Sequence, residues 1–81
     1  MTEAAEEFKE FVLTMLPDER DYISIREFDN ALLKFTWKTS DKISQESFVN
    51  PIGVGREIGR RYNVIDAAFI GNIFYMSVMP R

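Results

Sequence analysis

The sequence predicts a single α+β domain in which three helices precede a C-terminal two-stranded β-hairpin. Apolar residues recur at helical spacing near the N-terminus, and two β-rich runs flank a Gly-Asn pair near the C-terminus. Capping signals mark two further helix starts between these regions. The chain has 81 residues, of which 46% are hydrophobic. We therefore expect one domain over residues 1–81 with a core of its own.

The first predicted helix spans about residues 3–16. Thr2 is a favourable N-cap, and glutamates fill the first turns, where the helix dipole stabilises negative charge. One stripe of this helix is apolar and consists of Ala5, Phe8, Phe11, Val12, Met15 and Leu16. Pro17 ends the helix, and residues 17–21 form a polar turn.

The second predicted helix spans about residues 25–37. Ser24 and Glu27 have the spacing of a capping box. Apolar residues follow with helical period, namely Ile25, Phe28, Ala31, Leu32 and Phe35. Residues 22–24 are too short for an independent strand but can add an edge strand to a sheet built elsewhere. We expect Trp37 to cover the core.

Residues 38–47 are the polar stretch of the chain, and residues 39–42 are the expected loop. Residues 43–49 are ambiguous, and Ser44 or Ser47 can cap a short helical turn there. The third predicted helix spans residues 51–62, because Asn50 is a strong N-cap and proline is favoured at the first helical position. Its inward side holds Ile52, Gly55, Ile58, Gly59 and Tyr62. The two glycines on this side predict the close approach of another helix.

The predicted hairpin turns at Gly71-Asn72, because glycine at the first central position suits a type II′ turn. This register pairs Ile70 with Ile73, Phe69 with Phe74, Ala67 with Met76, and Ile65 with Val78. One face is then entirely apolar and consists of Ile65, Ala67, Phe69, Phe74, Met76 and Val78. The other face is mixed.

The order helix, short strand, helix, helix, hairpin resembles that of winged helix-turn-helix domains. The resemblance covers residues 3–79 and depends on element order alone. It implies that the helix at 51–62 enters the major groove of DNA and that the hairpin is the wing.

Three arginines, Arg56, Arg60 and Arg61, are the candidates for DNA contact, since guanidinium groups bind guanine edges and phosphates. Lys38 and Lys42, with Lys34, extend this patch as phosphate contacts. The alternative is a solvated helix face on which Glu57 pairs with Arg60 or Arg61. The expected function is binding of double-stranded DNA, by a transcription regulator or by a module of a replication or mobile-element protein.

A second hypothesis is a protein–protein interaction module that does not bind DNA. Its contact surface is either the acidic first helix or the outer face of the hairpin, where exposed apolar side chains would form an interface. The interface candidates are Ile70, Ile73, Tyr75 and Met79. The net charge of −3 favours this hypothesis, and the partner is a second copy or another protein.

The chain has no cysteine and no histidine. It therefore lacks disulfides, thiolate metal sites and the commonest general base near neutral pH. We expect no enzymatic activity, no cofactor and no metal. No apolar run reaches the length of a membrane span, and the acidic N-terminus is unlike a signal peptide, so we expect a cytoplasmic protein without a membrane partner.

Overall fold

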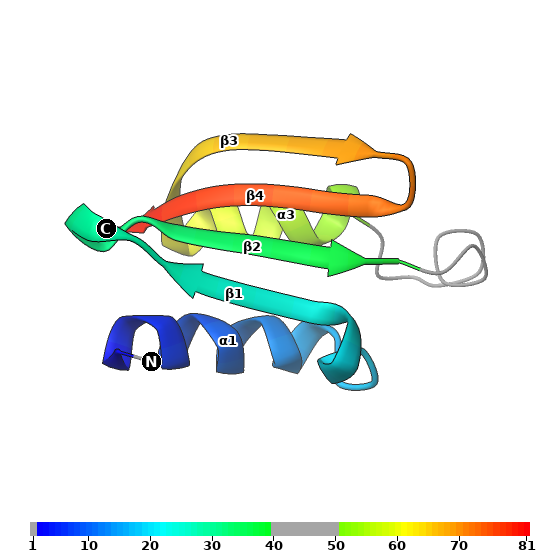
Figure 1. Cartoon of the computed structure of the whole chain (residues 1–81), viewed down its shortest axis with the longest axis horizontal. Helices are drawn as coiled ribbons and strands as arrows, with labels where there is room; N and C mark the ends of the chain where they lie inside the picture. Colours follow the sequence, from blue (N-terminus) through cyan, green and yellow to red (C-terminus); the bar gives the residue numbers. More distant parts are fainter. Residues whose placement is uncertain (1, 40–50) are drawn as a thin grey trace.

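The computed structural model describes residues 2–39 and 51–81, which form a two-layer α+β fold (Figure 1). The helices are α1 (Glu3–Met15) and α3 (Pro51–Arg61), and the strands are β1 (Ile23–Glu27), β2 (Leu33–Lys38), β3 (Tyr62–Ile70) and β4 (Ile73–Pro80). Two short 3-10 turns lie at Arg20–Tyr22 and Asp29–Ala31. The four strands make one antiparallel sheet in the order β1-β2-β4-β3.

The predicted order of three helices and a hairpin is wrong, and with it the winged-helix architecture. Residues 25–37, predicted as the second helix, form most of β1, a turn and β2. Along β2 the buried residues Leu33, Phe35 and Trp37 alternate with more exposed neighbours, which is the period of a strand. In the turn, Asn30 and Ala31 have φ angles of 70° and 63°, which a right-handed helix excludes.

The core lies between the sheet and the two helices, and β2 and β4 supply its sheet side. Its fully or nearly fully buried residues are Ala5, Phe8, Val12, Leu16, Leu33, Phe35, Trp37, Val54, Ile58, Phe74, Met76 and Val78. Phe35 makes edge-on ring contacts with Phe8 of α1 and Phe74 of β4, at centroid distances of 5.9 and 6.1 Å. Because β2 and β4 are the two central strands, a neighbouring strand flanks their inward side chains on each side.

Trp37 is fully buried, as expected, although from a strand. Its indole N–H donates a hydrogen bond of 3.1 Å to the carboxylate of Glu19, which is itself buried. An indole N–H needs a hydrogen-bond partner when it is buried. The polar turn before β1 supplies that partner through Glu19.

The first and third predicted helices are confirmed, but Ile52, predicted on the inward side of the third, is 75% exposed, and Val54 is buried in its place. The Thr2 side chain accepts the Ala5 N–H at 3.3 Å and so caps α1, whereas Glu27 accepts the Thr2 hydroxyl and takes no part in the predicted capping box. Gly55 was predicted to face another helix, and this prediction is wrong, because Gly55 faces the sheet. A Cβ there would meet Phe74 and Met76 of the sheet at 3.5 and 3.8 Å, not another helix.

The predicted hairpin register is confirmed from Ile70–Ile73 to Ala67–Met76, and Gly71 has a φ of 63°. The pairing of Ile65 with Val78 is wrong, because a β-bulge between Val64 and Asp66 places Val64 opposite Val78. The hairpin is also not a free wing, since β4 pairs with β2 along most of its length. Lys42, Asn50 and the predicted turn at 43–49 lie outside the described residues.

Candidate functional site

The candidate site is the sheet face opposite the helices, which no described element covers; we call it the open face. Side chains of directly paired residues share a face, so the register defines rows across the sheet. These rows are, first, Arg26, Lys34, Ser77 and Asp66; second, Ser24, Thr36, Tyr75 and Ala68; third, Lys38, Ile73 and Ile70.

The three rows carry positive charge in a chain whose net charge is −3. Their cations are Arg26, Lys34 and Lys38, and their one carboxylate belongs to Asp66. Phe28, in the turn after β1, extends the positive end of this face. Its ring centroid lies 5.5 Å from the Arg26 guanidinium carbon and 5.1 Å from the Lys34 ammonium.

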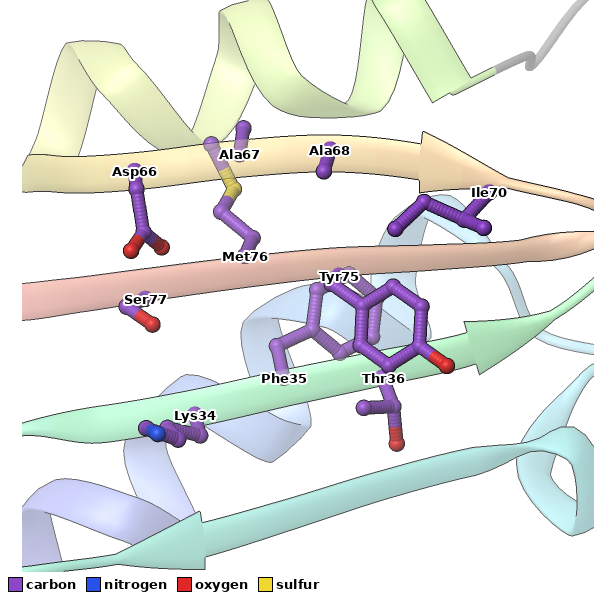
Figure 2. A pocket seen from close by; sticks show the side chains of 10 residues that line it. All are labelled: Lys34, Phe35, Thr36, Asp66, Ala67, Ala68, Ile70, Tyr75, Met76 and Ser77. Atoms are coloured by element: carbon purple, nitrogen blue, oxygen red, sulfur yellow. The ribbon is translucent and has the colours of Figure 1, made fainter.

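A shallow hollow of about 380 Å³ lies across β2, β4 and β3 on the open face. Figure 2 shows the Tyr75 ring extending from β4 over β2 toward Thr36, whereas Ser77 lies further along β4, near Asp66 and Lys34. Lys34 and Asp66 lie at the opposite end from Ile70. The hollow thus combines the exposed Tyr75 ring, the hydroxyl groups of Thr36 and Ser77, and one charge of each sign.

The second feature is the free edge of β3, since β3 pairs only with β4 among the described strands. Its exposed large hydrophobic residues are Val64 (41%), Ile65 (56%), Phe69 (49%) and Ile70 (66%). After the half-buried Tyr62, every residue of the strand is exposed, and Asp66 is its one charged residue.

The candidate DNA-binding residues are divided between two sides of the molecule. Arg56, Arg60 and Arg61 lie on α3, in the helical layer, whereas Lys38 lies on the open face. Arg60 forms an ion pair of 2.9 Å with Glu57, one of the pairs expected for a solvated helix face. The Arg61 guanidinium carbon lies 4.4 Å from the ring centroid of Phe11 on α1.

The four predicted interface residues, by contrast, come together. All four lie on the open face. Ile73, Tyr75 and Met79 occupy alternate positions of β4, and Ile70 of β3 pairs directly with Ile73. Ile70 and Tyr75 are exposed, and Ile73 and Met79 are half-buried. The glutamates of α1, the other proposed contact, also face solvent and are Glu3, Glu6, Glu7 and Glu10.

Sequence reasoning missed Arg26 and Phe28, because both were assigned to the predicted second helix. The signal that could have found them is the alternation of Leu33, Phe35 and Trp37 with polar residues. That alternation predicts a strand, and a strand places Lys34 and Lys38 on one face, where Arg26 of β1 pairs with Lys34.

Tyr62, where α3 meets β3, joins the two layers at the other end of the fold. Its ring centroid lies 4.8 Å from that of Phe8 and 6.2 Å from that of Phe11. Burial and the nearby Glu7 carboxylate raise the pKa of the Tyr62 hydroxyl above its usual value of 10.0, and Arg61 opposes this shift.

No family model, no curated protein and no solved structure matches this chain. In the part of the chain that the structure describes, no helix is long and apolar enough to cross a membrane. The same part holds no group of three or more acidic side chains arranged to bind a metal ion. The function is therefore argued from the open face and the free edge.

Proposed function

We propose that this chain is a protein-interaction module that forms a homodimer by pairing β3 with the β3 strand of a second copy. The observation that carries this proposal is the free edge of β3, which is nine residues long, largely hydrophobic and exposed. An edge of this kind presents unpaired main-chain groups and is a template for another strand.

The hairpin loop indicates which main-chain groups of β3 are free. A two-residue loop makes the flanking pair, Ile70 and Ile73, a hydrogen-bonded pair, and the pairs then alternate along the ladder. Ala68 therefore points its N–H and C=O toward β4, whereas Ala67 and Phe69 point theirs toward the free edge. Within residues 66–70, these two residues are the ones able to bond another strand.

An antiparallel pairing about a two-fold axis at Ala68 satisfies these groups. It places Ala67 opposite Phe69 of the second copy, and Asp66 opposite Ile70, so no like charges face each other. It uses residues 66–70, beyond the bulge at Val64 and Asp66. Alanine at the axis permits close approach, and Phe69 becomes covered. The partner is therefore a second copy, because the strand is complementary to itself.

Cysteine cross-linking tests this register in a chain that has no cysteine of its own. In the proposed dimer the two copies of residue 68 form a non-hydrogen-bonded pair with Cα atoms about 4.5 Å apart, which suits a disulfide. We expect Ala68→Cys to form a disulfide-linked dimer under mild oxidation, and the wild-type chain to have the mass of two chains in light scattering.

Ser24→Cys is the matched control, because Ser24 is exposed on the other edge strand, β1. Cross-linking of Ser24→Cys at the same rate as Ala68→Cys contradicts the proposal. So does a wild-type chain that stays monomeric at high concentration.

Binding of duplex DNA through Arg56, Arg60 and Arg61 stays a prediction. The element order that implied a recognition helix is absent, so only the charge of these three arginines supports it. Titration of the triple alanine variant with duplex DNA tests it. Binding that does not depend on salt, or that survives the change of all three arginines to alanine, would contradict that prediction.

A further inference from the structure

The charge of the open face is opposite to that of the chain as a whole. Arg26, Lys34 and Lys38 are exposed there and face one carboxylate, that of Asp66, while the glutamates of α1 lie in the other layer. Such a separation of charge attracts a polyanion to one side of the molecule.

The cations are spread along β2 and across to β1 and do not converge on one point. Lys34 and Lys38 lie four residues apart on β2, a separation of about 13 Å along a strand. Arg26 lies beside Lys34 on β1. This spacing suits successive charges along an extended chain better than it suits a single phosphate.

Aromatic rings lie among these cations. Tyr75, 38% exposed, stands at the centre of the open face, and Phe28, 40% exposed, lies at its positive end against Arg26 and Lys34. A base stacked on Tyr75 would sit beside Thr36 in the hollow, whose lining also includes the Ser77 hydroxyl and the Asp66 carboxylate. Both hydroxyls and carboxylates hydrogen-bond base edges.

We propose that the open face binds single-stranded nucleic acid, with Arg26, Lys34 and Lys38 contacting phosphates and with Tyr75 and Phe28 stacking on unpaired bases. Cationic grooves with exposed aromatic rings bind single strands in this way. A duplex keeps its bases stacked, and the described part of the open face has no helix to enter a groove. The proposal does not depend on pairing of β3.

Fluorescence anisotropy with labelled oligothymidine and oligouridine of about 12 nucleotides, and with a duplex of the same length, tests this proposal. We expect the single strands to bind at least tenfold more tightly than the duplex. With three phosphate contacts, affinity for the single strands falls about 20-fold between about 50 and about 200 mM salt.

Two pairs of variants assign the contacts. Lys34→Glu with Lys38→Glu lowers affinity at least tenfold, whereas Arg56→Glu with Arg60→Glu, the same charge change on α3, alters it less than threefold. Tyr75→Ala lowers affinity roughly tenfold, and Tyr75→Phe, which keeps a stacking ring, stays within twofold of the wild type. Trp37 fluorescence reports whether each variant is folded, because Trp37 is buried in the core.

Several results would overturn the proposal. Tighter binding of the duplex would assign the contact to the arginines of α3. So would an equal loss of affinity in the α3 double variant and the Lys34, Lys38 double variant. If Tyr75→Ala and the wild type bind single strands equally tightly, Tyr75 does not stack on a base, and the open face attracts any polyanion by its charge. Full competition by polyglutamate at matched charge indicates an acidic protein as the partner of this face.

Discussion

The two edge strands of the sheet, β1 and β3, differ in nearly every property that controls strand pairing. β1 has five residues and ends in Arg26 and Glu27, and α1 runs alongside it (Figure 1). Glu27 also accepts a hydrogen bond from Thr2 at the start of α1. β3 has nine residues, one charge and four exposed large hydrophobic side chains.

Short length, charge and a covering helix are the features by which proteins protect an edge from unwanted pairing. β1 has all three of them. β3 has one charge, Asp66, and a bulge between Val64 and Asp66, which disrupts one part of the strand and leaves residues 66–70 regular. The difference shows that the fold protects the β1 edge and leaves the β3 edge open among the described residues.

The largest expected effect on stability comes from replacing a phenylalanine in a central strand, compared with replacing one at the free edge. Phe35 is fully buried in β2, and Phe69 is 49% exposed in β3. We expect Phe35→Ala to lower the free energy of unfolding by about 3–5 kcal/mol. Phe69→Ala should lower it by less than about 1 kcal/mol in dilute, monomeric protein. Urea unfolding followed by Trp37 fluorescence measures both, and equal losses would mean that β3 is covered within one chain.

The next effect separates two adjacent alanines of β3 by the direction of their main-chain groups. Ala68→Pro removes an N–H that points toward β4, and we expect the free energy of unfolding to fall by about 2–3 kcal/mol. Ala67→Pro removes an N–H that points toward the free edge. It should change the stability of the monomer by less than about 1 kcal/mol but raise the dimer dissociation constant at least tenfold.

Analytical ultracentrifugation measures the dimer, and urea unfolding of dilute protein measures the monomer. The opposite assignment, with Ala67→Pro unfolding the chain and Ala68→Pro only preventing dimerisation, would contradict the register deduced for the free edge.

The smallest effect concerns Tyr62, the half-buried first residue of β3. Because its pKa is raised in the folded chain, the unfolded chain loses this proton first as pH rises above 10.0. Ionisation then favours unfolding, so stability is fully present below pH 10.0 and falls as pH rises through the folded-state pKa. Tyr62→Phe should make this alkaline loss of stability shallower. Urea unfolding at a series of alkaline pH values measures it, and identical slopes would exclude this role.

Local signals were sufficient for three elements of this protein. Thr2 caps α1 with its own hydroxyl, Pro51 suits the first turn of α3, and Gly71 takes the positive φ of the hairpin turn. Each of these depends on residues within a few positions, so the sequence by itself determined α1, α3 and most of the hairpin register.

Only the tertiary structure decided the state of residues 25–37. Their apolar residues fit a helix and a strand about equally well, and a capping box favoured the helix. A strand is stable only when it is paired, and β2 lies between β1 and β4, the latter some forty residues along the chain. The open face and the free edge follow from that pairing, because it is the packing of the layers that decides which side chains stay in contact with water.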